Sequence, residues 1–293
     1  MRLSQYLAKN YNISRREAKE EISNGKVILN SQICVKDKEI SDLDKVDYNK
    51  NISIKDDSIL NTNIINHDET SNFKKYVIYK DNDYLFLYKP YFMHSDRHRQ
   101  NDPLTISDII NYYKTYVSLT RLDYETDGII GAVSSLLYEK IKNKNLPVSK
   151  KYLAITYGIF PKHIEISNKI DAKKTQKVKV IENDDSGNLT SINLLKSKVI
   201  KIFNEEIQIS LIEVELNIAA RHQIRAYTSF LKHPILFDPF YGDSEKDNML
   251  LEHIKNKDIP KRLMLHCKEY NINNKSINCT DYTLKFIDYF NNI

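Results

Sequence analysis

The chain has 293 residues, of which 41% are hydrophobic, and its formal net charge is +5 at neutral pH. This length predicts two domains, or one large domain with an appendage. No apolar run approaches the roughly 20 residues of a membrane span, so we expect no membrane segment. The first residues lead into a polar helical pattern and not into a signal peptide. The mild positive charge permits an anionic partner such as nucleic acid.

The three cysteines are Cys34, Cys267 and Cys279. They are scattered along the chain, odd in number and without the spacing of metal ligands. This usage favours a reducing compartment, the cytoplasm, over an oxidising one. We therefore expect neither a disulfide framework nor a metal site.

Residues 1–60 form the first predicted unit. A short helix is followed by a second helix that begins near Ser14, because Ser14 and Glu17 have the spacing of a capping box. The second helix ends at Asn24-Gly25, and a strand and turn follow over 26–32. Four basic residues then share one solvent-exposed face: Arg15, Arg16, Lys19 and Lys26. Judged by charge alone, a solvated face is favoured over a binding surface, because three glutamates are interleaved with these residues.

Several positions of this unit resemble the S4-type RNA-binding domain. They are Arg2-Leu3, Ser14-Arg15, Ile22, Gly25, Val27 and Leu29-Asn30. The resemblance implies that the second helix and the following loop hold structured RNA through its shape and its phosphates. Residues 61–75 are polar and without periodicity, which is typical of a linker.

Residues 76–293 form the second predicted unit, in which strands and helices are interspersed. A hairpin is predicted over 76–88, and helices over 104–115 and 134–144. The stretch 218–227 is predicted to run into a further helix that continues through Leu231. Strands are predicted over 150–158, 178–182, 190–195, 207–216 and 262–266. The expected fold class is α+β: a mixed, mainly antiparallel sheet with flanking helices, preceded by the small α/β domain.

Asp123 lies in the stretch 120–130, just before a predicted turn at Asp127-Gly128 and a buried strand that starts at Ile129. A carboxylate on such a loop is held at a rigid sheet edge, where chemistry is often placed. Taken alone, however, an aspartate in a loop is more often a turn or cap residue.

Two further segments carry candidate residues. Tyr152 lies in the alternating strand 150–158, where its ordinary role is that of a half-buried aromatic. Arg221 and Arg225 have helical spacing, which predicts that they share one helix face, one turn apart.

Taken together, these segments resemble one family. Arg121-Leu122-Asp123 with Thr126 and Gly128 resembles the catalytic motif of the RluA-type pseudouridine synthases. The other motifs of that family are matched in the same order by Lys89-Pro90, Lys151-Tyr152-Leu153-Ala154 with Gly158, His222-Gln223-Ile224-Arg225, His233-Pro234-Ile235, Asp238-Pro239 with Tyr241-Gly242, and Leu265-His266.

The resemblance implies an enzyme that isomerises uridine to pseudouridine in RNA, with no cofactor and no metal, in a cleft across the sheet. An S4-type domain ahead of the catalytic domain is the layout of members that modify large-subunit ribosomal RNA. We therefore expect 23S ribosomal RNA as the partner and a monomeric protein. The departures from the family pattern, which bear on RNA contacts and target choice, are Thr120, Asp127, Ile218-Ala219-Ala220 and Tyr227.

The resemblance also assigns roles. Asp123 attacks the nucleotide or removes a sugar proton, Arg225 keeps that carboxylate ionised, and Tyr152 stacks on the target base, which must leave its own stack. Its hydroxyl is a candidate for taking the proton from carbon 5. The residues expected to bind RNA are Arg15, Arg16, Lys19, Lys26, Arg121, Arg221 and His222.

Two other functions stay open at this point. One is a ribosomal RNA-binding or assembly factor that has lost catalysis, which the departures motivate. The other is a hydrolase that uses Asp123 with Glu125 as an acid/base pair, although no second motif supports it.

Overall fold

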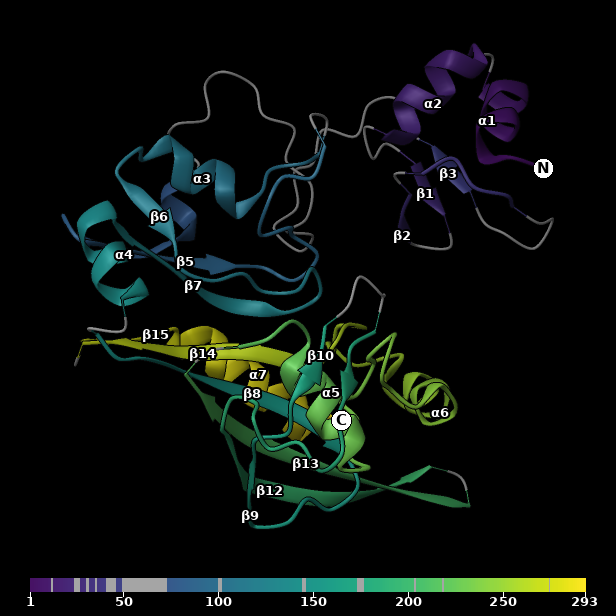
Figure 1. Cartoon of the computed structure of the whole chain (residues 1–293). Coiled ribbons are helices and arrows are strands. Elements are labelled where there is room, and N and C mark those ends of the chain that lie inside the picture. Colours follow the sequence, from purple (N-terminus) through teal and green to yellow (C-terminus); the bar gives the residue numbers. More distant parts are fainter. Residues whose placement is uncertain are drawn as a thin grey trace. The chain divides into compact units, whose positions relative to one another are not determined.

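The computed structural model describes residues 1–11, 13–23, 27–29, 32–34, 36–40, 46–48, 73–99, 102–143, 146–172, 177–202, 204–217, 219–273 and 275–293 (Figure 1). The chain divides into two compact units, Met1–Asn66 and His67–Ile293. Most of the linker predicted over 61–75 lies outside the described residues, and so does Lys26.

The first unit contains the two predicted helices, α1 (Leu3–Tyr11) and α2 (Arg15–Ser23). Three short strands, β1 (Val27–Leu29), β2 (Gln32–Ile33) and β3 (Val46–Tyr48), form an antiparallel sheet in the order β2-β1-β3. The helices pack on this sheet through Leu3, Leu7, Ala18, Ile22 and Val27, whose side chains are fully buried. The hydroxyl of Ser14 accepts a hydrogen bond from the backbone N–H of Glu17, as expected for a cap at the start of α2.

The second unit is built on a ten-stranded sheet in which β4-β5-β7-β14-β8-β13-β12-β9 are neighbours in that order, while β6 pairs with β7 and β15 with β14. Of the described pairings, only that of β7 with β14 is parallel, so the prediction of a mixed, mainly antiparallel sheet is confirmed. The strands are β4 (Val77–Lys80), β5 (Tyr84–Lys89), β6 (Tyr116–Ser118), β7 (Asp127–Ser134), β8 (Val148–Tyr157), β9 (His163–Ile166), β12 (Thr190–Ile202), β13 (Glu205–Leu216), β14 (Leu265–Ile272) and β15 (Lys275–Asn278). A separate pair is formed by β10 (Ile170–Asp171) and β11 (Lys179–Val180).

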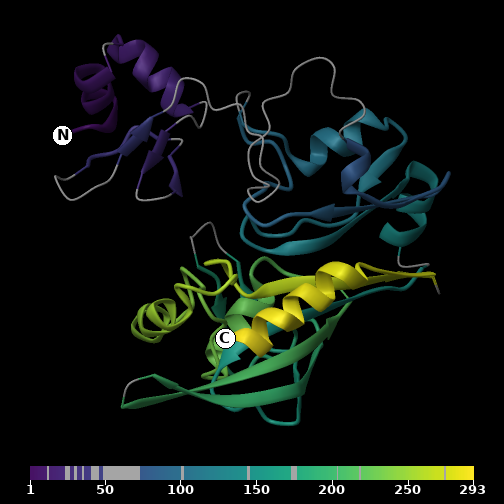
Figure 2. The ribbon, with the colours of Figure 1, turned by 180° about the vertical axis from the view of Figure 1, so that it is seen from behind.

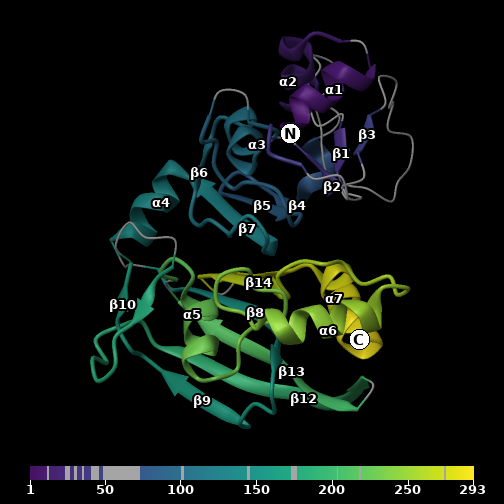
Figure 3. The same ribbon diagram turned by 90° about the vertical axis from the view of Figure 1, so that its right-hand side faces the viewer.

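Helices cover both faces of this sheet. Figures 1, 2 and 3 show α5 (Gln223–Phe230) on one face of β8 and β13, and α7 (Thr280–Asn292) on the opposite face. Near the other end of the sheet, α3 (Ile106–Tyr112) packs against β6 and α4 (Ser135–Lys142) against β7. The remaining helices are the 3₁₀ turn η2 (Phe73–Tyr76) and α6 (Ser244–Ile254). The predicted α+β class is therefore observed.

One edge of β7 changes its partner part-way along the strand. Asp127 and Gly128 pair with β14, whereas residues 132–134 pair with β6; the other edge of β7 pairs with β5 throughout. Since β6 and β14 diverge from the same edge, the loop 119–126 that joins β6 to β7 leaves the sheet at this fork. The fork places Asp123 where a side chain can project beyond the strands.

Gly128 is required by this geometry. Its φ is +121°, and a Cβ atom at this position would lie 2.2 Å from the carbonyl oxygen of Cys267 in β14. A side chain would therefore separate the two parallel strands, and only glycine adopts this backbone conformation without strain.

The turn predicted at Asp127-Gly128 is wrong. The chain turns at Tyr124 and Glu125, and Asp127 is the first residue of β7, 4% exposed. Its carboxylate lies 2.9 Å from a guanidinium nitrogen of Arg262 and 3.2 Å from Nδ1 of His266. These partners come from a distant segment of the chain, so the local preference of aspartate for turns is overridden by a buried ion pair.

Candidate active site

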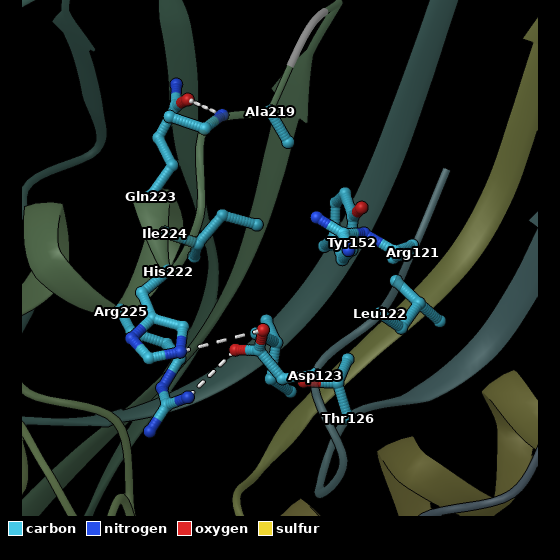
Figure 4. A pocket seen from close by; sticks show the side chains of 12 residues that line it. Arg121, Leu122, Asp123, Thr126, Tyr152, Ala219, His222, Gln223, Ile224 and Arg225 are labelled. Atoms are coloured by element: carbon cyan, nitrogen blue, oxygen red, sulfur yellow. Dashed lines mark hydrogen bonds and ion pairs between the residues drawn. The ribbon is translucent and has the colours of Figure 1, made fainter. Parts of the chain in front are cut away.

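The carboxylate of Asp123 and the guanidinium of Arg225 meet in the second unit. Oδ2 of Asp123, on the loop before β7, accepts a hydrogen bond of 2.8 Å from Nη1 of Arg225 on α5. The Asp123 side chain is 28% exposed and that of Arg225 only 2%. Figure 4 shows Arg225 and His222 reaching the same carboxylate from one side. The arrangement leaves an accessible carboxylate held by a buried cation.

Arg225 is itself fixed by Asp238, a fully buried carboxylate. Its Nε and Nη2 donate to the two oxygens of Asp238 at 2.8 and 2.7 Å, and Oδ1 of Asp238 also accepts from the backbone N–H groups of Phe240 and Tyr241. Burial by itself lowers the pKa of Arg225, but the hydrogen bonds and charge of Asp238, followed by the charge of Asp123, raise it above its ordinary value. This bidentate pair aims the remaining nitrogen at Asp123.

His222 lies nearest to the other oxygen of the same carboxylate. Its Nε2 is 3.8 Å from Oδ1 of Asp123, and its Nδ1 is 3.2 Å from the hydroxyl of Tyr241. The backbone of His222 adopts a left-handed conformation, with φ of 56°, immediately before α5. Burial lowers the pKa of His222 in spite of the nearby Asp123, so its imidazole is neutral at neutral pH.

Tyr152 lies on β8 and lines the same pocket as Asp123. Burial, and then the neighbouring Cys267, raise the pKa of Tyr152 well above its ordinary value. The phenol therefore stays protonated at neutral pH, which favours a stacking surface for a base over a phenolate that takes a proton. The residues lining this pocket are Arg121, Leu122, Asp123, Thr126, Tyr152, Ala219, Ala220, His222, Gln223, Ile224, Arg225 and Leu265.

The residues predicted to bind RNA lie in different places. Arg121 is 73% exposed and its Nη1 lies 3.3 Å from Asp96. Arg221 is exposed and precedes α5, whereas Arg225 is buried within it, so the prediction that they share one helix face is wrong. Because Arg221 lies in the turn before α5 and Arg225 lies within the helix, their two side chains lie in different environments. In the first unit, the exposed basic residues of α2 are Arg15, Arg16 and Lys19.

Two residues that hold the loop of Asp123 were given no role in the sequence analysis. Lys89 is fully buried, and its ammonium group donates to the carbonyls of Pro90, Met93 and Tyr124 at 3.0, 2.8 and 3.3 Å. Burial lowers the pKa of Lys89 to about 7. On the other side of Asp123, the hydroxyl of Ser95 lies 2.7 Å from the Leu122 carbonyl oxygen and 3.0 Å from the Leu122 N–H.

Asp238, which fixes the guanidinium of Arg225, is a third residue whose role was not predicted. The only signal for these roles was the position of Lys89 and Asp238 directly before prolines, inside stretches that already resembled family motifs.

Within the described ranges, no group of three or more histidine, cysteine or acidic side chains is placed to hold a metal ion. In the part of the chain that the structure describes, no helix is both long enough and apolar enough to span a bilayer.

The profile of the RNA pseudouridylate synthase family matches residues 83–230, a span that contains Asp123, Tyr152 and Arg225. The chain belongs to this family. Its members are isomerases, and every residue that lines the pocket around Asp123, except Leu265, lies within the matched segment.

Relatives with known names agree with this membership. An uncharacterised RNA pseudouridine synthase of Helicobacter pylori is 31% identical over 66% of this chain and 69% of its own length. A protein named ribosomal large subunit pseudouridine synthase C, from Buchnera aphidicola, is 27% identical over 68% of this chain and 62% of its own length. Among solved structures, human RNA pseudouridylate synthase domain containing 1 is similar with a TM-score of 0.50 and 20% identity, over 69% of this chain and 81% of the human chain, which supports the fold.

Proposed function

We propose that this RNA pseudouridine synthase modifies large-subunit ribosomal RNA and that Asp123 is its catalytic group. The observation that carries the proposal is the pair of Asp123 and Arg225, in which a partly exposed carboxylate is held 2.8 Å from a buried and independently fixed cation. A nearby positive charge keeps a carboxylate ionised, as both a nucleophile and a base must be.

The reaction needs few participants. The bond between C1′ of the ribose and N1 of uracil breaks, the base turns, and a bond forms between C1′ and C5. The proton on C5 then leaves, and N1 carries a proton in the product. In one route, the carboxylate of Asp123 bonds to C1′ as the base departs and is released when C5 bonds to C1′. In the other, it removes a sugar proton as the base departs and returns that proton to the same carbon when the new bond forms.

Tyr152 and His222 fit supporting roles in this reaction. A target base that has left its stack needs an apolar surface to lie on, and the neutral ring of Tyr152 at the pocket wall offers one. His222, with Arg121 and Arg221, is proposed to contact the RNA around the target nucleotide.

We further propose that residues 1–60 form an S4-type RNA-binding domain that holds the ribosomal RNA. The two helices and small sheet of the first unit, with Arg15, Arg16 and Lys19 exposed on α2, support this assignment. The name of the Buchnera relative supports a large-subunit target. A cytoplasmic monomer agrees with three buried cysteines that form no disulfide.

Replacement of Asp123 by asparagine tests the catalytic assignment. Asp123→Asn keeps the size and the hydrogen-bond acceptor but cannot act as a carboxylate, so pseudouridine formation should fall by at least about a thousandfold. The melting temperature and RNA affinity should stay close to those of the wild type, because phosphate contacts come from basic residues. Pseudouridine mapping in large-subunit ribosomal RNA, with wild type and mutant, gives the turnover and the target together.

Glu125→Gln is the matched control, since Glu125 lies two residues further along the same loop. The isomerase proposal predicts that this variant keeps most of its turnover, whereas a hydrolase using both carboxylates would lose it and would release a cleaved product. Substantial turnover by a verified Asp123→Asn protein would refute the catalytic role of Asp123. A wild type that binds ribosomal RNA without modifying any uridine would instead identify an inactive assembly factor.

A further inference from the structure

A row of aromatic rings lies on the surface next to the catalytic loop. Tyr124, which follows Asp123 directly, has its ring centroid 4.5 Å from that of His94 and 5.7 Å from that of Phe92. The His94 ring in turn lies 5.3 Å from the ring of His98. Phe92 is 37% exposed and Tyr124 is 45% exposed. We call Phe92, His94 and Tyr124 the ring platform.

The backbone at Phe92 is strained. Its φ is 60°, in the left-handed region that a bulky residue rarely adopts and that costs conformational free energy. The conformation is held by a hydrogen bond of 2.7 Å from the N–H of Phe92 to the carbonyl of Tyr124. Glycine would adopt the same conformation without this cost. A phenylalanine here carries a backbone penalty and still presents its ring to solvent, which indicates a use for the ring outside the fold.

The platform is uncharged and is anchored to the loop that carries the catalytic carboxylate. Burial, and then the neighbouring His98, lower the pKa of His94, so its ring is neutral at neutral pH. The Lys89 ammonium group donates to the same Tyr124 carbonyl that accepts from Phe92. Arg121, on the other side of Asp123, exposes 73% of its side chain to an approaching phosphate. Flat neutral rings beside an exposed guanidinium are the components with which proteins hold unpaired nucleotides.

We propose that the ring platform stacks an unpaired base of the RNA next to the target uridine. The proposal rests on the proposed function, and it adds a second base-binding site outside the pocket of Asp123 and Tyr152. Tyr124 directly follows Asp123, and consecutive Cα atoms are about 3.8 Å apart. A nucleotide beside the target therefore has Tyr124 and its neighbours within reach. The substrate class is a uridine in an unpaired segment whose neighbouring base is free to stack.

Phe92→Gly tests the platform without damaging the fold, because the substitution removes the ring and relieves the backbone. Binding is measured for two RNA probes: a nonamer of uridylate, and the same nonamer with abasic residues at all positions except the centre. The wild type should bind the intact probe about 5- to 100-fold more tightly than the abasic probe. In Phe92→Gly this ratio should fall by about threefold or more, with a melting temperature equal to or above that of the wild type.

Two control variants test whether the change in the binding ratio is specific to the ring of Phe92. Tyr112→Ala removes an aromatic that is 43% exposed on α3, and Asn273→Gly relieves a positive φ of 47° at the turn between β14 and β15. Both should keep the wild-type ratio. A Phe92→Gly protein that also keeps the wild-type ratio would overturn the platform. Absence of pseudouridine from ribosomal RNA treated with the wild type would overturn the proposed function instead, while the binding ratios would still decide whether the rings stack on bases.

Discussion

At the scale of single residues, the candidate site depends on a chain of charges and not on Asp123 alone. Asp238 fixes Arg225 through two hydrogen bonds, and Arg225 offers its remaining nitrogen to Asp123. Asp238 is fully buried, and within the described residues its charge is compensated by this guanidinium and by two backbone N–H groups. The partly exposed carboxylate of Asp123 is thus held by a guanidinium whose own position is fixed by a buried carboxylate.

Removal of this support should cost both stability and turnover. Asp238→Ala removes one of the two carboxylates that the buried guanidinium of Arg225 contacts. The free energy of unfolding should therefore fall by about 3–5 kcal/mol. Turnover at saturating RNA should fall more than affinity, because Arg225 no longer has one orientation. Urea unfolding and separate measurement of kcat and KM check this prediction.

Asp243→Ala is the control for Asp238→Ala. Asp243 caps α6 through a hydrogen bond to the N–H of Lys246, so its loss should cost about 1 kcal/mol and leave kcat unchanged. Equal effects of the two variants on kcat would show that Asp238 has no special role in positioning Arg225.

The sequence analysis identified the residues of the candidate site but not the contacts that hold them in position. Asp123, Tyr152 and Arg225 were identified through motifs, and the structure brings all three to one pocket. The roles of Asp238 and Lys89 were missed, because a buried charge is recognised by its partners and those partners are distant in sequence. Asp127 was assigned to a turn for the same reason.

At the scale of elements, the close contact of β7 with β14 determines where the loop of Asp123 ends. Gly128 and Gly131 lie on the same strand but in different surroundings. A Cβ atom at Gly128 would meet the backbone of β14 at 2.2 Å, whereas one at Gly131 would meet only side-chain atoms of Phe86 and Tyr270 at 3.2 Å.

These two glycines form a matched pair of substitutions. Gly128→Ala should destabilise the protein by about 2–6 kcal/mol, since strain at positive φ adds to the collision with the strand backbone. Gly131→Ala should cost no more than about 1–3 kcal/mol, because the buried rings of Phe86 and Tyr270 need to shift by only a few tenths of an ångström. Thermal and urea unfolding of both variants measure the difference, and a larger loss in Gly131→Ala would contradict the importance of the parallel contact.

Element prediction succeeded where the pattern was local. The helix predicted over 104–115 is α3, and that over 134–144 is α4, each shorter at its ends. The strand predicted over 190–195 is the first half of β12, whose later residues are largely polar and exposed. Neither α6 nor α7 was predicted. The apolar face of α7 contains Phe286 and Phe290, and it becomes recognisable only once the sheet that it covers is known.

At the scale of the whole molecule, we expect the first unit to bind RNA and the second unit to modify it. We expect that deletion of residues 1–60 weakens the binding of ribosomal RNA and lowers the salt dependence of that binding, because phosphate contacts of α2 are lost. Turnover at saturating RNA should persist, since Asp123 and its partners all belong to the second unit. Affinity measured over a range of salt concentrations, together with single-turnover assays, tests this division.

A matched variant keeps the first unit and removes only three positive charges of α2. The triple substitution of Arg15, Arg16 and Lys19 by glutamine should reproduce most of the loss in affinity and in salt slope. If the folded truncation bound RNA as well as the full chain did, the first unit would have no part in RNA binding.

The fork in β7 also has a consequence for how the protein is made. Strand β7, which follows the loop of Asp123, pairs with β14 through Asp127 and His266, so roughly 140 residues must be synthesised before that edge finds its partner. At about 5–20 residues per second, the ribosome needs roughly 7–30 seconds for this stretch. During that time the buried side chains of β7 have no cover from β14, and the pocket around Asp123 cannot close. An RNA-modifying site of this design becomes active only when almost the entire chain has been translated.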